Sequence, residues 1–493
     1  MGKGGEGEAV SPGSRIFHAP GFEYYVIAVI GVKTRIDPQV VKQGLINTLL
    51  NHPRFSSILV KEGRKWRWNP TTVNLEDHVI VAETEPHLDF PEADRFLEDY
   101  VSNVTKTPLD ISKPLWEIHL LINLRTSESE AVCVLRIHHS LGDGASLMSL
   151  LLAASRKTSD PLALPTVPVL SKTTTTSDHR RLSGGCSLWR FLSALWGIVP
   201  LLWNTLVDLV MFALTVLFLR DSDTPLKGAP AGAELHTMRF VHRHLCLDDV
   251  KFVKTAMKMT INDVLLGVTQ AGLTRYLNRT YGAAEEYGKQ RSNHSHKLSK
   301  LRLRATIMFN VRPNAGIQEL ADMMREKSKA RWGWGNRLGL VIVPLPIISQ
   351  DDDPLQYVGQ AKAMIDRKKH SLESFCTFYC AKLVLNLLGI KVASAIIRRV
   401  FSNTTMAFSN VVGPMEEISC FGHPLAYIAP STYGHPHLQA LTIHFQSYYN
   451  KMTLSIAADP TVISDVHLLC DDFQLSLKLI RDAADKNLVP HAV

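Results

Sequence analysis

The sequence has few cysteines, and none of them has the spacing of a metal site. The 493-residue chain holds seven cysteines, an odd number, and no Cys-x-x-Cys pair occurs. A zinc site and a disulfide framework are therefore both excluded as organising features. A reducing compartment is the simplest interpretation. We expect no metal and no bound cofactor.

A strong excess of charge of either sign is also missing. Lys and Arg number 54 and Asp and Glu number 46, which gives a net charge of +8. Without a clustered basic face, nucleic acid is not an expected partner. The small positive excess fits an anionic membrane surface or an anionic substrate. Apolar residues at 45% exclude a wholly disordered chain, and the length allows about two or three domains.

No apolar run occurs near the N-terminus, so no signal peptide is expected there. Residues 1–14 are rich in glycine and are predicted to be disordered. The one long apolar run is internal, at residues 191–219, and Asp208 is its only charged residue. About 20 apolar residues suffice to cross a bilayer, so this run is long enough.

The polar exceptions in this run lie on one narrow helical stripe. Such a stripe favours a membrane-associated helix that lies against protein or in the membrane interface over one that spans freely. A proline in the run could instead divide it into a helical hairpin. The stripe residues are Ser193, Gly197, Pro200, Asn204, Asp208 and Thr215.

The rest of the chain mixes strands and helices in two halves, which indicates two α/β lobes. We assign residues 15–160 to an N-terminal lobe and residues 233–493 to a C-terminal lobe. Residues 161–190, rich in Pro, Ser and Thr, form a polar linker before the apolar run. In the second half, residues 375–400 are predicted to be one apolar helical stretch, and a strand hairpin is predicted over Tyr-Tyr-Asn-Lys at 448–451.

The strongest chemical pattern is His-His-Ser-Leu-Gly-Asp-Gly, residues 138–144, between a predicted strand and a predicted helix. Because consecutive strand residues point in opposite directions, one of His138 and His139 can face a cleft. A neutral imidazole there can accept a proton. Asp143 stands where a carboxylate would cap the next helix. A structural His pair with a capping Asp is the competing interpretation.

Two other chemistries fit this pattern less well. A metal site lacks further clustered ligands, and a serine-nucleophile triad lacks the Gly-x-Ser-x-Gly motif.

Five segments, in order, resemble the plant form of the wax ester synthase/diacylglycerol acyltransferase family, of the CoA-dependent acyltransferase superfamily. His-His-x-x-x-Asp-Gly is its signature, and the other four matches extend the resemblance along nearly the whole chain. They are SPGSRIF (11–17), PLWE (114–117), Asn262-Asp263 in TINDVLLG, and SNVVGP (409–414).

The resemblance implies a chloramphenicol acetyltransferase-like α/β fold of two lobes with a tunnel between them, carrying the apolar helix as an insertion. It implies that His139 is the general base, with His138 supporting it by packing and Asp143 organising the loop. Arg312 is a speculative partner of Asp143.

The resemblance also suggests roles for other motif residues. Ser409 and Asn410 are candidate oxyanion donors. Asn262 and Asp263 either line the tunnel or cap a helix. Pro114, Leu115 and Trp116 are expected in the core, and Gly413 and Pro414 in a turn.

The implied activity is transfer of a long-chain acyl group from acyl-CoA to a long-chain alcohol, with diacylglycerol as a second acceptor. Membrane lipid is an implied partner. The endoplasmic reticulum membrane is the implied location, with both lobes cytosolic, and the plasma membrane is the alternative. Two other functions remain open. One is a different acyl transfer on the same scaffold, and the other is an inactive lipid-binding membrane protein.

Overall fold

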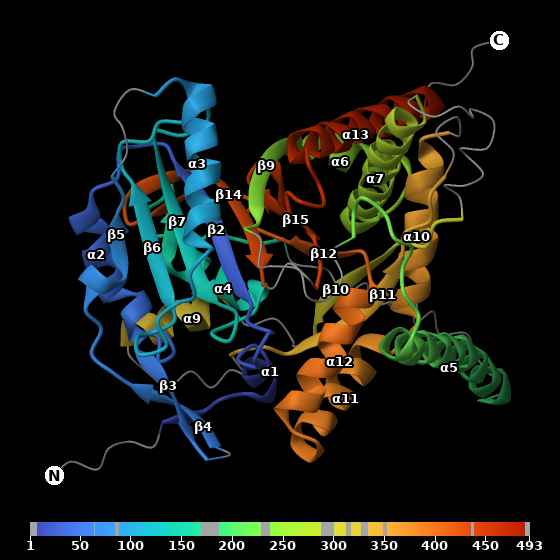
Figure 1. The fold of residues 1–493 in the computed structure, drawn as a ribbon, viewed down its shortest axis with the longest axis horizontal. Helices are drawn as coiled ribbons and strands as arrows, with labels where there is room; N and C mark the ends of the chain where they lie inside the picture. Colours follow the sequence, from blue (N-terminus) through green and yellow to red (C-terminus); the bar gives the residue numbers. More distant parts are fainter. Residues whose placement is uncertain are drawn as a thin grey trace.

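The computed structural model describes residues 7–488 apart from several internal segments, and shows two lobes, each built on a β-sheet (Figure 1). The internal segments outside the description are 64, 84–87, 169–186, 228–236, 287–299, 312–316, 327–333, 349–352 and 435–437. Residues 187–197, 283–286, 318–319, 325–326 and 488 are described by their backbone alone.

The first lobe contains a seven-stranded sheet, and its core includes the fully buried Trp116. Leu115 is buried beside it, and the Trp116 indole N–H donates to the carbonyl of Phe55 at 2.9 Å, which confirms the predicted core position of this motif. Helix α3 (Phe90–Val104) crosses one face of the sheet (Figure 1). The strand order is β5 (Val79–Val81), β6 (Trp116–Leu121), β7 (Ala131–His138), β2 (Tyr25–Val32), β14 (His423–Tyr433), β13 (Ile418–Cys420) and β8 (Ser155–Lys157).

Two strands of this sheet come from the second half of the chain, so the assignment of 233–493 to one lobe is wrong for them. β14 pairs with β2 from Leu425 to Tyr433, and β13 extends the sheet beyond it. Helix α9 (Ile317–Glu326) also packs on α4 (Gly144–Ala154) of the first lobe. β14 was not predicted because it contains Pro424 and Pro430, and proline in a run argues against a strand.

The second lobe contains a six-stranded sheet with its own buried core. The predicted hairpin is confirmed: β15 and β16 pair through a tight turn in which Tyr449 has a φ of 52°. Helices α6 (Leu247–Ala256), α7 (Ile261–Glu286), α10 (Leu355–Lys369) and α13 (Val466–Leu488) pack on it and on one another. The strand order is β11 (Leu338–Pro344), β10 (Arg304–Asn310), β12 (Met406–Val411), β15 (Leu441–Tyr448), β16 (Lys451–Ala458) and β9 (Arg239–Cys246).

The N-terminal segment has regular structure from Glu8 onward, so the prediction of disorder over 1–14 is wrong for its later residues. β1 (Glu8–Ala9) joins β4 (Lys65–Pro70) and β3 (Ser57–Glu62) in a small third sheet. Helix α1 (Pro12–Ile16) follows, capped by the Ser11 hydroxyl, with Pro12 in its first turn. Helix α2 (Pro38–Asn47) and the short 3₁₀ helices η1 (Leu49–Asn51) and η2 (Leu75–Asp77) complete this lobe.

The apolar run forms one helix, α5 (Ser187–Leu217), which continues through Pro200, so the proline does not divide it. Asn204, Asp208 and Thr215 of the predicted stripe contact the second lobe, whereas Pro200 is exposed. Ser193 and Gly197 are described by their backbone alone. The preference for a helix lying against protein is therefore confirmed from Asn204 to Thr215.

The single helical stretch predicted over 375–400 is two helices, α11 (Glu373–Leu387) and α12 (Ile390–Asn403). The break lies at Gly389, whose φ of 85° is a conformation that glycine adopts without steric cost. α11 packs along the edge strand β11, and α12 packs on α5. An edge covered by a helix is protected from pairing with another chain.

Candidate active site

The loop 138–144 connects β7 to α4 and places its two histidines in different surroundings. His138 ends β7 opposite Tyr25, and the backbone N–H of His139 donates to the Tyr24 carbonyl at 2.8 Å. Asp143 caps α4 by accepting hydrogen bonds from the backbone N–H of Ser146 at 3.0 Å and from its hydroxyl at 2.8 Å. The predicted helix cap at Asp143 is therefore confirmed.

The His139 ring is held on one face and at one nitrogen. Phe17, just after α1, stacks on it with ring centroids 4.4 Å apart. Its Nδ1 lies 3.2 Å from the amide oxygen of Asn336. Because an amide oxygen only accepts, Nδ1 carries the proton and Nε2 keeps a free electron pair. A neutral imidazole in this tautomer can act as a base through Nε2.

The orientation of Asn336 is fixed by its own amide N–H groups. They donate to the His139 carbonyl at 2.7 Å and to the Ser14 hydroxyl at 3.1 Å. Two residues earlier, the Trp334 indole N–H donates to the Leu141 carbonyl at 2.6 Å. Segments 11–17, 138–144 and 334–336, far apart in the sequence, thus assemble around one imidazole.

The pKa of His139 is lowered below its ordinary value, chiefly because burial disfavours the charged ring. The backbone of His139, the negative charge of Asp143 and the hydrogen bond with Asn336 act in the opposite direction. The result is an imidazole that stays neutral at neutral pH. This is the protonation state that a general base needs before it reacts.

His138 has the surroundings of a structural residue. Its Nδ1 lies 2.7 Å from the Ser140 hydroxyl and accepts the Ser140 backbone N–H at 3.2 Å. Its ring stacks on His18 with centroids 4.3 Å apart. Burial, followed by the neighbouring His18 and His139, holds its pKa well below the usual range. These contacts agree with the prediction that His138 packs and supports rather than reacts.

The second lobe brings His444 within electrostatic reach of His139. His444 lies on β15 in register with Ser409 on β12, so the two side chains share a face of the sheet. Burial, followed by the charge of His139, lowers the pKa of His444 to about 4. Its Nδ1 is buried without a hydrogen-bond partner among the described residues. Ser409 is half-buried there.

The same strand β12 approaches the start of α4. A Cβ added at Gly144 would lie 3.5 Å from the Val411 side chain. The loop 138–144 therefore contacts the second lobe directly, and the two lobes meet at the loop that carries His139.

Asn262, Asp263 and Asn410 form a separate group at the start of α7. The Asp263 carboxylate accepts the Thr260 backbone N–H at 2.7 Å, and the Thr260 hydroxyl accepts the Asp263 backbone N–H at 3.3 Å. This reciprocal pair is a capping box, so the capping interpretation holds for Asp263. The amide of Asn410 donates to the Asn262 side-chain oxygen at 2.6 Å.

The structure thus connects two of the predicted site motifs through Asn410 and Asn262. Gly413 lies where a Cβ would collide with the Ser447 carbonyl, which explains glycine there by close backbone approach. Pro414 is buried in the same irregular segment, and Arg312 lies outside the described residues.

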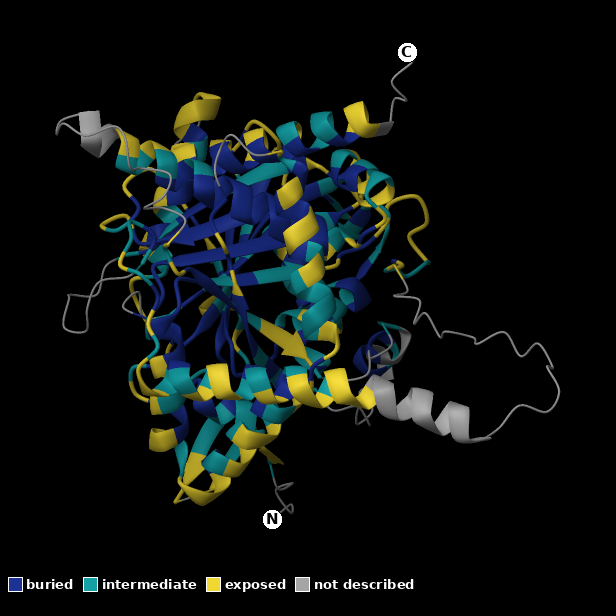
Figure 2. Cartoon of the chain, turned by 90° about the vertical axis from the view of Figure 1, so that its right-hand side faces the viewer, coloured by how far each residue is buried: buried dark blue, intermediate teal, exposed yellow. Residues whose placement is uncertain are grey.

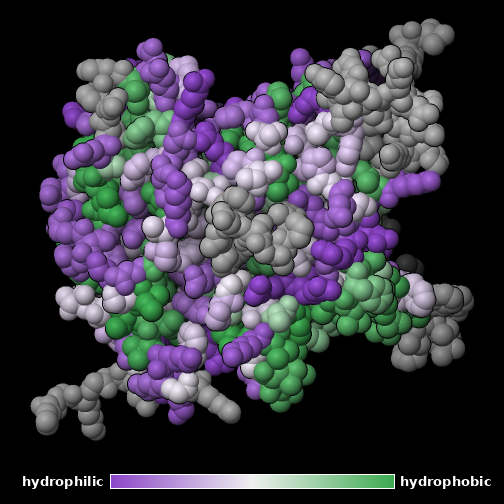
Figure 3. Space-filling model, in the orientation of Figure 1, coloured by the Kyte–Doolittle hydropathy of each residue, from purple (hydrophilic) through white to green (hydrophobic). Residues whose placement is uncertain are grey.

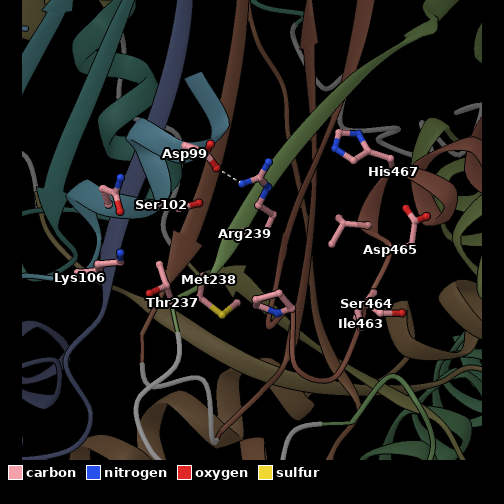
Figure 4. A pocket seen from close by; sticks show the side chains of 13 residues that line it. Asp99, Ser102, Lys106, Thr237, Met238, Arg239, Ile463, Ser464, Asp465 and His467 are labelled. Atoms are coloured by element: carbon pink, nitrogen blue, oxygen red, sulfur yellow. Dashed lines mark hydrogen bonds and ion pairs between the residues drawn. The ribbon is translucent and has the colours of Figure 1, made fainter. Parts of the chain in front are cut away.

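A cavity of about 610 Å³ opens between the lobes (Figure 4), and His139 is not among the residues that line it. Its walls come from α3 on one side and from β9 and the start of α13 on the other. Arg239 crosses it to bond Asp99 and Glu98. None of the predicted site residues lines this cavity. In the part of the chain that the structure describes, no group of three or more His, Cys, Asp or Glu could hold a metal ion.

Asn336 and His444 were missed by the sequence reasoning. Asn336 ends the segment Arg-Trp-Gly-Trp-Gly-Asn at 331–336, which has no local pattern that points to a histidine 197 residues away. The only sequence indication for His444 was its place in a predicted strand beside SNVVGP.

Models of two protein families match this chain. The wax ester synthase/diacylglycerol acyltransferase catalytic domain matches residues 39–265, and the WS/DGAT C-terminal domain matches residues 334–481. Wax ester synthase/diacylglycerol acyltransferase 11 of Arabidopsis thaliana is 53% identical over 97% of this chain and 95% of its own length. The chain belongs to the wax ester synthase/diacylglycerol acyltransferase family. It is an acyltransferase, as the resemblance of its motifs implied.

Other comparisons agree with this family membership. Wax ester synthase/diacylglycerol acyltransferase 5 of Arabidopsis thaliana is 50% identical over 97% of this chain and 94% of its own length. Among solved structures, the wax ester synthase/diacylglycerol acyltransferase from Marinobacter aquaeolei VT8 aligns with a TM-score of 0.58 at 16% identity, covering 97% of this chain and all of the other.

The first condensation domain of the CDA synthetase aligns with a TM-score of 0.55 at 13% identity, covering 97% of each chain. These likenesses confirm the two-lobe acyltransferase fold.

Proposed function

We propose that this acyltransferase moves a long-chain acyl group from acyl-CoA to a long-chain alcohol and so makes wax ester. Diacylglycerol is the second acceptor. The observation that carries the proposal is the Nδ1-protonated tautomer of His139, which leaves Nε2 as a base at the junction of the lobes. The relatives named above support this reaction class.

In the proposed reaction, Nε2 of His139 takes the proton from the alcohol hydroxyl as its oxygen attacks the thioester carbonyl. The tetrahedral intermediate then collapses, the C–S bond breaks, and the imidazolium returns the proton to the CoA sulfur. No acyl-enzyme forms. Because both substrates must meet at one imidazole, holding them in the right geometry is the main catalytic task.

The negative oxygen of the intermediate needs a hydrogen-bond donor. Ser409 is supported by its register with His444 on the neighbouring strand, because His444 interacts electrostatically with His139. Asn410 is the second candidate, although its amide already donates to Asn262. Ser409→Ala and Asn410→Ala should separate the two, because losing the true donor lowers kcat by about 100-fold or more.

We further propose that the protein works at the cytosolic face of the endoplasmic reticulum membrane, with the plasma membrane as the alternative. The 20-residue segment Ile198–Leu217 supports this, because it has a mean hydropathy of 1.8. Both proposed lipid substrates partition into membranes, so an enzyme at the membrane meets them directly.

The test uses microsomes from a host that lacks neutral-lipid synthesis, expressing the wild type or His139→Ala. Labelled palmitoyl-CoA is supplied with hexadecanol, with diacylglycerol, or with both in competition. Wax ester from the wild type alone supports the proposal, and the ratio of wax ester to triacylglycerol ranks the acceptors. Folded, membrane-bound wild type that makes neither product would overturn the proposed acceptors.

A further inference from the structure

Three helices of the second lobe, α5, α11 and α12, leave a continuous apolar surface exposed (Figure 3). Large side chains on α5 are exposed by up to 64%, and those on α11 by up to 72%. On α11 the exposed residues recur every fourth position, which is one helix face. The exposed residues on α5 are Ile198, Val199, Leu202, Trp203, Leu206, Val210, Met211 and Leu217, and those on α11 and α12 are Phe375, Tyr379, Leu383, Leu387 and Val392.

Scattered exposed apolar residues are normal on soluble proteins, but a contiguous apolar surface over three helices is not. α12 packs directly on α5, and the Arg399 guanidinium donates to the Leu217 carbonyl at 3.3 Å. Seen at right angles to Figure 1, α5 lies across the outside of the lobe with its exposed residues turned away from the protein (Figure 2). The three helices therefore present one surface and not three separate ones.

The opposite side of α5 is bonded to the protein along its length. Asn204 donates to the His370 carbonyl at 3.1 Å, and the Thr205 hydroxyl accepts the Leu372 N–H at 2.9 Å. Further along, the Lys368 ammonium lies 2.9 Å from the Asp208 carboxylate, and Asp208 is 2% exposed.

The last contact on this side is at Thr215, whose hydroxyl accepts from Arg304 at 2.5 Å. From Asn204 to Thr215 the helix rises about 16 Å. To cross a bilayer, α5 would have to break these bonds and carry an unpaired carboxylate into hydrocarbon, which is costly. The geometry is that of a helix lying in the plane of the membrane.

We propose that the surface of α5, α11 and α12 docks on one leaflet of an anionic lipid membrane, without spanning it. Exposed cations on the same three elements favour lipid over a second copy of the chain, since headgroup phosphates attract them. They are Arg220 just after α5, Lys382 on α11 and Lys391 on α12. The inference deepens the proposed membrane association and does not depend on the acyl acceptor.

The test is flotation of the purified full chain with two kinds of vesicle. One kind is phosphatidylcholine alone, and in the other phosphatidylserine replaces about a third of the lipid. The variant Tyr379→Glu/Leu383→Glu/Leu387→Glu places three charges on the exposed face of α11. The matched control, Ile111→Glu/Leu162→Glu/Leu475→Glu, places three charges on exposed apolar residues elsewhere. We expect at least a tenfold loss of vesicle binding for the α11 variant and little change for the control.

A second variant, Trp203→Glu/Leu206→Glu/Val210→Glu, tests α5 itself and should lose binding equally. If the α5 variant loses binding while the α11 variant keeps it, α5 alone anchors the protein and the proposal is wrong. A protein that dimerises through this surface and ignores both kinds of vesicle would also overturn it.

Circular dichroism confirms that each variant is folded. Acyl transfer to a short, water-soluble alcohol should survive in the α11 variant, so failure of docking and failure of the proposed reaction are distinguishable.

Discussion

The amide oxygen of Asn336 lies 3.2 Å from Nδ1 of His139, although 197 residues separate them in the chain. Asn336 donates in return to the His139 carbonyl and to Ser14, so its amide cannot turn without losing these bonds. The side chain thereby fixes both the ring orientation and the tautomer of the proposed base. It acts on the reaction only through His139 and is a positioning residue.

Replacing Asn336 with Ala should lower kcat by about 10- to 100-fold with a much smaller change in KM, as removal of a partner that orients a reacting group does. Asn336→Asp gives a distinct readout. A carboxylate beside the imidazole stabilises its charged form and raises the pKa of His139. The acid limb of the pH–kcat profile should therefore move to higher pH. An unchanged profile in the Asp variant would contradict the positioning role.

His139→Ala should mainly lower kcat, whereas His138→Ala should mainly lower stability. Loss of a general base costs about 100- to 10,000-fold in rate, so His139→Ala should lose kcat by that factor while remaining folded. His138→Ala removes a buried ring and its bond with Ser140, so its main effect should be a loss of about 1–3 kcal/mol of stability. Steady-state kinetics and urea unfolding measure the two effects. If His139→Ala and His138→Ala lost kcat by the same factor and were equally stable, this division of roles would be refuted.

The sequence predicted best where one local pattern determines the result. The loop 138–144 shows strand, turn and capping residue within seven positions, and the structure has all three. The hairpin at Tyr449 was likewise visible in the alternating residues on both sides. The pattern of strands and helices in two halves indicated two α/β lobes, whereas the family resemblance supplied the acyltransferase type of the fold and the role of His139.

The parts that were missed depend on contacts between distant segments. β14 carries prolines that argue against a strand, yet its pairing with β2 in the centre of a sheet outweighs them. Asn336 becomes a site residue only because the chain returns from the second half to pack on the first. Glu8 and Ser14 gain structure through partners at residues 67–68 and at Asn336, none of which a local pattern reveals.

The N-terminal segment should matter for both stability and catalysis. Phe17 is 5% exposed and stacks on His139, so Phe17→Ala should destabilise the protein by about 3 kcal/mol and lower kcat. Phe17→Leu keeps most of the apolar volume and loses only the stacked ring, so it should retain most of the stability. Thermal unfolding and kinetics of both variants check this. A fully active, stable Phe17→Ala variant would show that the segment plays no part in the site.

Acid should destabilise the protein below about pH 6.5. Burial lowers the pKa of His18 to about 4, of His52 to about 3 and of His444 to about 4. The unfolded chain takes up protons on these rings below about pH 6.5, whereas the folded chain does not until its own lower pKa values are reached. The free energy of unfolding therefore decreases as the pH is lowered, and at pH 5.5 the loss is about 1 kcal/mol per ring relative to neutral pH.

Urea unfolding midpoints at pH 7.5, 6.5 and 5.5 measure this acid dependence. His444→Phe should reduce the pH dependence between 6.5 and 5.5. Midpoints that do not change over this range would contradict the burial of these rings.

Asp208 should hold α5 to the second lobe. Burial alone would raise the pKa of Asp208, but hydrogen bonds from Lys368 and Arg367 outweigh it, so the pKa is lowered. The mostly buried Lys368 ammonium contacts two carboxylates, those of Asp208 and of Glu373, the latter at 2.6 Å. Asp208→Ala removes the first of them. The expected cost is about 3 kcal/mol, the low end for breaking a buried pair, because Arg367 is partly exposed.

The matched control is Asp366→Ala on α10, the helix that carries Lys368. The bonds of Asp366 to Lys362 and Lys369 are exposed and should be worth less than about 1 kcal/mol. Since the pKa of Asp208 is lowered in the folded chain, the advantage of the wild type should be present above about pH 4 and shrink as pH falls through the folded pKa. Urea unfolding at pH 7 and limited proteolysis between residues 198 and 222 report stability and release of α5. Equal losses in the two variants would show that the buried pair does not anchor the helix.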